Sequence, residues 1–183
     1  MVVITIPNNK PPNDETGAVE FCKILQDSLF SELTPSGEER GFRFLWNDNH
    51  TEIINVETFA GKNTRYVKEF YQELKKHELH IDLRSYDVED DLLKKYDVVI
   101  AYFEGTTDTN TVDALVNTLS EVCVVDKVEA EYSTHRLSLV SETLFDTPSI
   151  IIYLNEGAID LYSAVAEELV KFLLERPVSR RIG

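Results

Sequence analysis

Acidic and hydroxyl side chains are concentrated in one short stretch of the sequence, residues 104–113 (EGTTDTNTVD). The stretch follows an almost unbroken apolar run, residues 97–103, and precedes apolar positions that recur every three to four residues. This succession predicts a buried strand, a polar turn and a helix that Thr111 caps. Open α/β sheets bind their ligands at the carboxyl ends of strands. We therefore expect any ligand of this protein to bind at this turn.

The turn offers two kinds of functional group. Asp108 and Asp113 carry carboxylates that could attack a substrate carbon, such as the anomeric carbon of a sugar. The same two residues also have a purely structural explanation. Asp108 can be a turn residue, and Asp113 can be an acid in the first turn of a helix, where the helix dipole stabilises its charge. Because the turn has no basic residue, it suits a sugar or an amide better than a phosphate. The other candidate ligand-binding residues here are Glu104, Gly105, Thr106, Thr107 and Thr111.

A second strand-to-helix junction is expected at residues 59–67 (FAGKNTRYV). It resembles the phosphate loop of flavodoxins, and this resemblance implies a bound FMN at the amino end of a helix. Phe59 stands where that loop has a hydroxyl residue, and Lys62 interrupts its Gly-Asn-Thr run. An ordinary strand-to-helix turn is the simpler interpretation, so the sequence predicts no particular cofactor. The candidate ligand-binding residues at this junction are Gly61, Asn63 and Thr64.

Residues 97–113 also resemble the Asp-Gly…Asp-x-Gly-Thr segment of nucleoside deoxyribosyltransferases, through Glu104-Gly105, Asp108 and Thr111. The resemblance implies a Rossmann-like enzyme with a carboxylate nucleophile. Asp113 is the closest acid, one residue out of step, and the second glycine of the pattern is missing.

The composition is that of an acidic globular protein, with 183 residues, a net charge of -15 and 43% hydrophobic residues. Nucleic acids and anionic membranes need a basic face, so we expect neither as a partner. A basic protein or a small polar ligand is the expected kind of partner. We expect a cytoplasmic location with reduced thiols, because no signal peptide or spanning run is visible and both cysteines sit in apolar patterns. No metal site is predicted, since no histidine or cysteine cluster has the necessary spacing.

The elements expected around these residues alternate between strand and helix. Residues 41–46 and 52–59 are predicted to form a hairpin. Residues 122–132, 137–145 and 150–154 are predicted to form an antiparallel β-meander. The predicted fold class is α/β, a mixed sheet flanked by helices with a Rossmann-like core, ending in that meander and a C-terminal helix. We expect one domain over residues 1–183, with the one candidate sub-boundary near 119–121. The other predicted strands are at 2–6, 80–86 and 97–103, and the predicted helices at 16–33, 62–76, 111–119 and 158–175.

Two functions of different class follow. The sequence has only seven glycines and no complete catalytic constellation, which favours a non-catalytic interaction or regulatory domain. The alternative is a Rossmann-like small-molecule enzyme or binder that uses the 104–113 loop, either nucleoside deoxyribosyltransferase-like or flavodoxin-like. The sequence leaves open whether the protein is an enzyme, what its ligand is and how many copies assemble.

Overall fold

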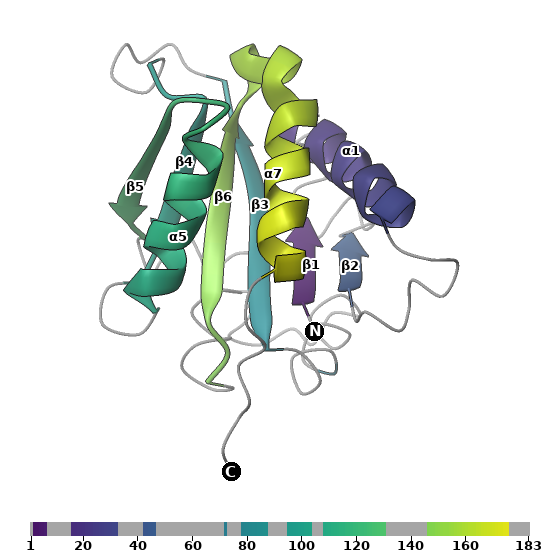
Figure 1. Cartoon of the computed structure of the whole chain (residues 1–183), viewed down its shortest axis with the longest axis vertical. Helices are drawn as coiled ribbons and strands as arrows, with labels where there is room; N and C mark the ends of the chain where they lie inside the picture. The colour runs from purple at the N-terminus through teal and green to yellow at the C-terminus, as the bar shows by residue number, and fades with distance from the viewer. Residues whose placement is uncertain are drawn as a thin grey trace, which may run out of the picture.

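Six strands form one mixed sheet in the order β2-β1-β3-β6-β4-β5 in the computed structural model (Figure 1). The structure describes residues 2–6, 16–32, 42–46, 72, 78–87, 95–103, 108–130 and 146–175. β1, β2, β3 and β6 are mutually parallel, whereas β4 and β5 run parallel to each other and antiparallel to β6. The strands are β1 (Val2–Ile6), β2 (Phe42–Trp46), β3 (Leu79–Tyr86), β4 (Val98–Tyr102), β5 (Val125–Glu129) and β6 (Ser149–Asn155).

The α/β class and the mixed sheet predicted from the sequence are confirmed, but the pairing differs in detail. β2 pairs in parallel with β1, and its expected hairpin partner, residues 52–59, lies outside the described residues. The antiparallel contact lies between β4 and β6, while β5 pairs in parallel with β4. The expected hairpin partner of β5, residues 137–145, is likewise outside the described part. β6 thus inserts between β3 and β4, which local patterns along the chain do not encode.

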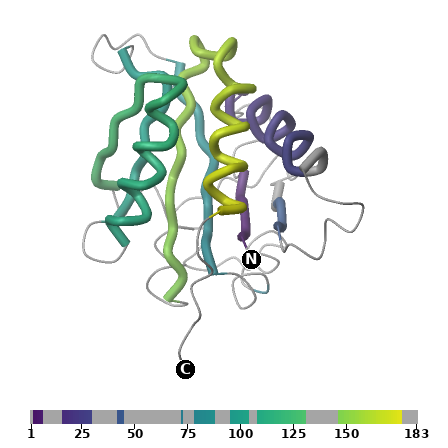
Figure 2. The backbone as a smooth tube through the Cα atoms, viewed as in Figure 1, coloured from purple at the N-terminus to yellow at the C-terminus, as the bar shows by residue number. Residues whose placement is uncertain are grey.

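The α-helices of the described part all cover the same face of this sheet (Figures 1 and 2). They are α1 (Thr16–Glu32), α5 (Thr109–Leu119) and α7 (Tyr162–Glu175), with the 3₁₀ helix η2 (Glu156–Leu161) leading into α7. Each α-helix buries an apolar stripe at helical spacing, which is why it packs on the sheet. In α5 the stripe is Val112, Leu115 and Leu119, and in α7 it includes Val165, Leu169 and Leu173.

Strand periodicity divides the interior into two parts. Alternate residues of each strand point toward the helices and join one large apolar cluster, for example Ile4, Ile81 and Ile152. The residues between them point to the opposite face, where Ala101, Phe103, Ala130 and Ile151 form a smaller cluster. Thr5, His80, Asp82 and Ser149 are also completely buried. Their register positions place them on this opposite face.

Two helix starts differ from the prediction. α5 begins at Thr109 and is capped by Asp108, not by Thr111, because the Asp108 carboxylate accepts the Asn110 backbone N–H at 3.0 Å. α7 begins at Tyr162, since residues 156–161 form η2 instead of the first turns of one long helix.

Candidate functional site

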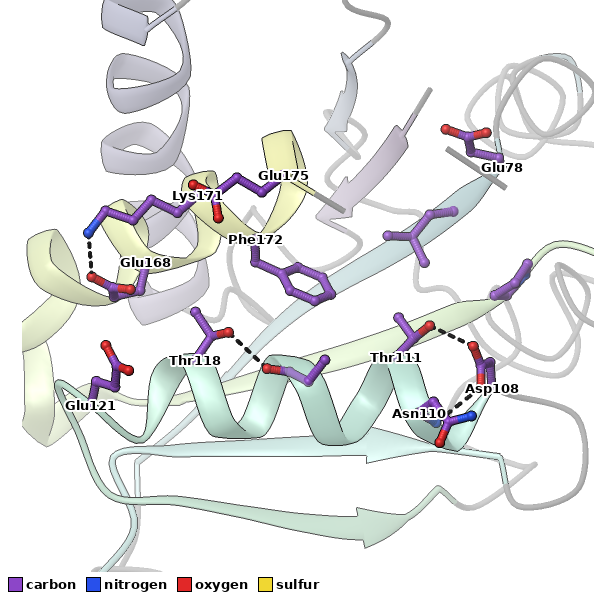
Figure 3. Close-up of a pocket in the computed structure, with 13 residues that line it drawn as sticks. Glu78, Asp108, Asn110, Thr111, Thr118, Glu121, Glu168, Lys171, Phe172 and Glu175 are labelled. Carbon is purple, nitrogen blue, oxygen red and sulfur yellow. Dashed lines mark hydrogen bonds and ion pairs between the residues drawn. The ribbon is translucent and has the colours of Figure 1, made fainter. Parts of the chain in front are cut away.

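A groove of about 810 Å³ runs between α5 and α7 (Figure 3). Its walls are helix faces whose side chains recur every three or four residues, so one side of each helix lines it. The ends of two strands complete it beneath the helices. The lining residues are Asp108, Asn110, Thr111, Ala114, Thr118 and Glu121 from α5 and its flanks, Glu168, Lys171, Phe172 and Glu175 from α7, and Glu78, Leu79 and Pro148 from the strand ends.

The direction of β4 determines where this groove lies. β4 is antiparallel to β6, so its carboxyl end lies at the same edge as the amino ends of β3 and β6. α5 follows β4 and therefore starts at that edge, next to Glu78 and Pro148. The start of α5 at Asp108 thus lies at the opposite edge from the carboxyl ends of the four parallel strands.

Asp108 is held in a fixed orientation at one end of the groove. One carboxylate oxygen accepts the Asn110 backbone N–H at 3.0 Å, and the other accepts the Thr111 hydroxyl at 2.8 Å. Both bonds come from residues of the same helix start, so folding of α5 itself orients the carboxylate. This residue is exposed, and a bound molecule could therefore reach it.

The groove is strongly acidic. Five carboxylates and one ammonium group line it among the residues that the structure describes. The ammonium of Lys171 donates to Glu168 at 2.8 Å, and this hydrogen bond raises the pKa of Lys171. α7 also ends at the groove with Glu175 and without a basic residue in its last turn, so the negative end of the helix dipole adds to the field.

The structure places the predicted site residues in different positions. Asp108 and Thr111 line the groove. Asp113 lies on another side of α5, where its half-exposed carboxylate accepts a hydrogen bond from Lys127 of β5. The remaining candidates are outside the described residues: Glu104, Gly105, Thr106, Thr107, Gly61, Asn63 and Thr64.

Sequence reasoning missed the α7 side of the groove. Glu168, Phe172 and Glu175 recur at intervals of four and three residues, which places them on one helix face. That spacing was available as a signal; Phe172 packs against the apolar core and also lines the groove. Its ring is only partly buried and lies between the two ends of the groove (Figure 3).

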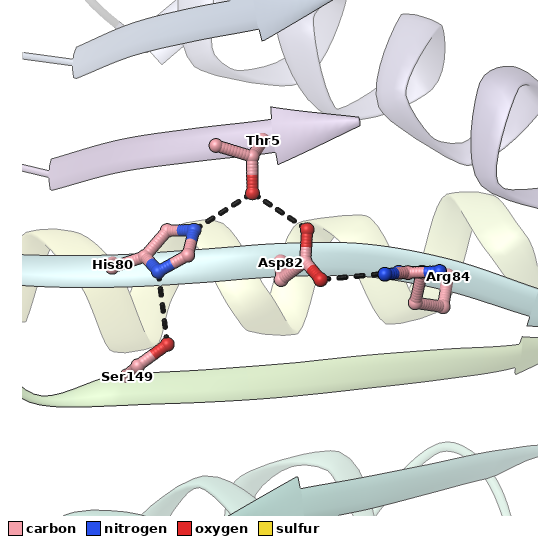
Figure 4. A network of polar contacts seen from close by, with 5 residues as sticks. All are labelled: Thr5, His80, Asp82, Arg84 and Ser149. Carbon is pink, nitrogen blue, oxygen red and sulfur yellow. Dashed lines mark hydrogen bonds and ion pairs between the residues drawn. The ribbon is translucent and has the colours of Figure 1, made fainter. Parts of the chain in front are cut away.

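A second polar constellation lies on the opposite face of the sheet (Figure 4). Thr5 of β1 donates its hydroxyl proton to Asp82 at 2.6 Å and contacts Nε2 of His80 at 2.7 Å. Nδ1 of His80 lies 2.9 Å from the Ser149 hydroxyl of β6, and Arg84 Nε donates to Asp82 at 3.1 Å. The chain of hydrogen bonds therefore joins three neighbouring parallel strands.

The donors in this chain determine the tautomer of His80. Thr5 has a single hydroxyl proton and donates it to Asp82, so it must accept from His80 Nε2–H. Nδ1 of the neutral ring is then the acceptor for the Ser149 hydroxyl. Burial lowers the pKa of His80 to about 4; Asp82 opposes this shift and Arg84 adds to it. The ring is consequently neutral at neutral pH.

A serine next to a histidine and a carboxylate has the composition of a nucleophilic triad. Ser149 and His80 are completely inaccessible to solvent, however, and the Thr5 hydroxyl separates His80 from Asp82. We interpret the chain as a structural connection between strands. The sequence signal was His80-Ile81-Asp82-Leu83-Arg84, in which period-two spacing places all three ionisable side chains on one face.

The carboxyl edge of β3 and β6 is held together by Glu156. One oxygen of its carboxylate accepts from the Thr16 hydroxyl, the Gly17 backbone N–H and the Ser85 hydroxyl, all within 3.1 Å. A Cβ on Gly17 would lie 2.6 Å from the Tyr162 hydroxyl, so only glycine permits this approach of α1. Glu156 thus serves as a remote cap of α1.

The described part of the chain contains no group of three or more His, Cys, Asp or Glu side chains that could hold a metal ion. None of its helices combines the length and apolar character needed to cross a bilayer. Cys22 and Cys123 are free thiols, and burial raises the pKa of Cys123 to about 12.

Comparison with known proteins finds the fold but no relative in sequence. No protein-family model matches the chain, and no curated protein matches it either. Among solved structures, a metallo-carboxypeptidase from Burkholderia cenocepacia aligns with a TM-score of 0.61 at 13% identity. The alignment covers 94% of this chain but 56% of that one, so this chain spans little more than half the length of the carboxypeptidase.

Two further structures align over most of both chains. N-formylglutamate amidohydrolase from Ralstonia eutropha has a TM-score of 0.56 at 11% identity, covering 94% of this chain and 91% of that one. The catalytic domain of an N-acetylmuramoyl-L-alanine amidase from Bacillus (Paenibacillus) polymyxa has a TM-score of 0.54 at 10% identity, covering 96% and 97%. These likenesses establish a shared α/β fold. The three proteins named above are enzymes, and the prediction of a non-catalytic interaction or regulatory domain is wrong.

Proposed function

We propose that this protein is a small-molecule enzyme whose substrate binds in the groove between α5 and α7. The observation that carries the proposal is the groove itself, which combines a volume of about 810 Å³ with polar walls and apolar residues beneath them. Small-molecule pockets have volumes of about 300–1,000 Å³, and the groove lies within this range. The sequence had independently indicated the 104–113 loop, and Asp108 and Thr111 of that loop line the groove.

An amide is the substrate that we favour. The solved neighbours named above are a carboxypeptidase, an amidase and an amidohydrolase, which supports cleavage of an amide bond. The polar groups around Asp108 are carboxylate, hydroxyl and side-chain amide, which can exchange hydrogen bonds with an amide. In this proposal Asp108 is the general base for an attacking water, because its carboxylate is fixed and exposed.

The Asp108→Asn substitution tests this role without unfolding the helix start, because Asn is as good an N-cap as Asp. Asp113→Asn is the matched control: it removes the same charge from the same helix, outside the groove. A panel of small amides is assayed for release of amine, with nucleosides and FMN included for the two family resemblances. We expect Asp108→Asn to lower kcat/KM at least 100-fold, the usual scale of a lost general base, while Asp113→Asn stays within about twofold.

Ligand binding gives a second readout. A ligand present at 100 times its Kd adds about 2.7 kcal/mol to the free energy of unfolding, so a thermal-shift screen detects it. Equal activities and equal thermal shifts for the two variants would show that the groove is not the substrate site.

A further inference from the structure

We infer that the groove between α5 and α7 takes an organic ammonium ion, a positively charged amine on an apolar body. The inference rests on the proposed function, because it names the class of molecule that the same groove binds.

The groove has an excess of negative charge that a cationic ligand would neutralise. The single ammonium group among its described residues, that of Lys171, is already engaged by Glu168. Carboxylates of Glu78, Asp108, Glu121 and Glu175 also line the groove, and α7 ends at Glu175. A cationic ligand would lower the repulsion among these groups, whereas an anionic ligand would increase it.

The groove also has an apolar part that can contact the body of an organic ligand. Phe172 projects its partly buried ring between the acidic ends, as Figure 3 shows, and Leu79 and Pro148 lie on the strand side. An aromatic face bordered by carboxylates attracts an organic cation both through its ring and through charge. The carboxylates come from α5, α7 and the residue before β3, and among the described residues no three of them form a group that could hold a metal ion, which needs several oxygen ligands at one point. An elongated organic cation therefore matches the groove better than a metal ion.

Three probes with one apolar body and different head groups test the inference. They are 4-phenylbutylammonium, 4-phenylbutan-1-ol and 4-phenylbutyrate, each titrated calorimetrically into the whole protein at low salt. We expect the ammonium probe to bind at least tenfold more tightly than the alcohol, and the carboxylate probe not to bind.

Two variants locate the bound probe. Glu175→Gln should weaken the ammonium probe about fivefold, the effect of one partly screened charge, and leave the alcohol unchanged. Phe172→Leu keeps an apolar side chain but removes the ring, and should weaken both probes. Glu129→Gln on the exposed edge strand β5 changes the net charge equally and should weaken neither.

The possible results distinguish a failure of the ammonium assignment from a failure of the proposed enzymatic function. If the alcohol binds as tightly as the ammonium and Phe172→Leu weakens both, the charge assignment is overturned and the groove remains the site. If no probe binds, or if Glu129→Gln acts like Glu175→Gln, the inference is also overturned. The activity comparison of Asp108→Asn with Asp113→Asn then decides the proposed function separately.

Discussion

The two faces of the sheet place ionisable side chains in opposite environments. On the helix-covered face, Asp108 and Glu175 lie at the surface above a continuous apolar core. On the opposite face, His80 and Asp82 are completely buried and bonded to their neighbours. Exposed carboxylates beside a groove are available to a ligand, whereas buried and satisfied groups connect strands. Accessibility, and not residue type, therefore separates the candidate site from the structural network in this protein.

The largest effect is expected from breaking the ion pair between the buried Asp82 and the partly buried Arg84. Asp82→Asn keeps the shape and the acceptor for Thr5 but removes the charge that Arg84 faces across 3.1 Å. Removing one charge of a buried ion pair costs about 3–5 kcal/mol, and the partial exposure of Arg84 points to the lower end of this range. Urea unfolding measures the loss, and a change below about 1 kcal/mol would show that the opposite face tolerates the loss of the Asp82 charge.

A comparable loss is expected from the apolar core on the helix-covered face. Leu169 of α7 is fully buried, so Leu169→Ala should lower the free energy of unfolding by about 2–5 kcal/mol. Ile159→Ala is the control, because the Ile159 side chain is exposed and should contribute little. If denaturant melts give equal losses for both variants, α7 does not pack on the sheet as described.

The opposite face should also make stability depend on pH. The folded-state pKa of His80, about 4, lies below the ordinary value of 6.5, so the unfolded chain takes up this proton first. The contribution of neutral His80 is complete above about pH 6.5 and is lost as the pH falls toward 4, by about 3 kcal/mol in total. His80→Gln does not titrate and should flatten this part of the profile in urea melts between pH 7 and 4. Parallel profiles for parent and variant would contradict the assignment.

The smallest effect is expected at the surface pair of Asp113 and Lys127. Both side chains are about half exposed, and such surface pairs contribute little to stability. Asp113→Asn should therefore change the unfolding midpoint slightly at low salt and not at all at 1 M salt. A loss as large as that of Asp82→Asn would remove the distinction between exposed and buried pairs.

Local sequence patterns predicted the elements better than their partners. Residues 2–6 and 97–103 are compact apolar runs, and both contain strands at nearly those bounds. The antiparallel pairing of β4 with β6 joins segments about 50 residues apart, and nothing within either segment specifies its neighbour. The cap of α5 was misplaced by three residues, since Asp108 and Thr111 are both acceptable capping residues.

The sequence predicted only one side of the candidate site, for a related reason. The polar turn revealed Asp108 and Thr111, but the two aspartates were indistinguishable until β5 placed Lys127 beside Asp113. Glu168 and Phe172 belong to a helix that begins more than 50 residues later, and only the packing of α7 against α5 brings them to the groove. Side chains contributed by distant elements require the tertiary structure.

The most direct test of the difference between the faces is an amide chemical-shift titration of the ¹⁵N-labelled protein with 4-phenylbutylammonium. A ligand site on the helix-covered face predicts saturable shifts at Thr111, Ala114 and Phe172, with Thr5, His80 and Ser149 unchanged. Shifts confined to Thr5, His80 and Ser149 would contradict the account, because they would place the accessible site on the face described here as closed.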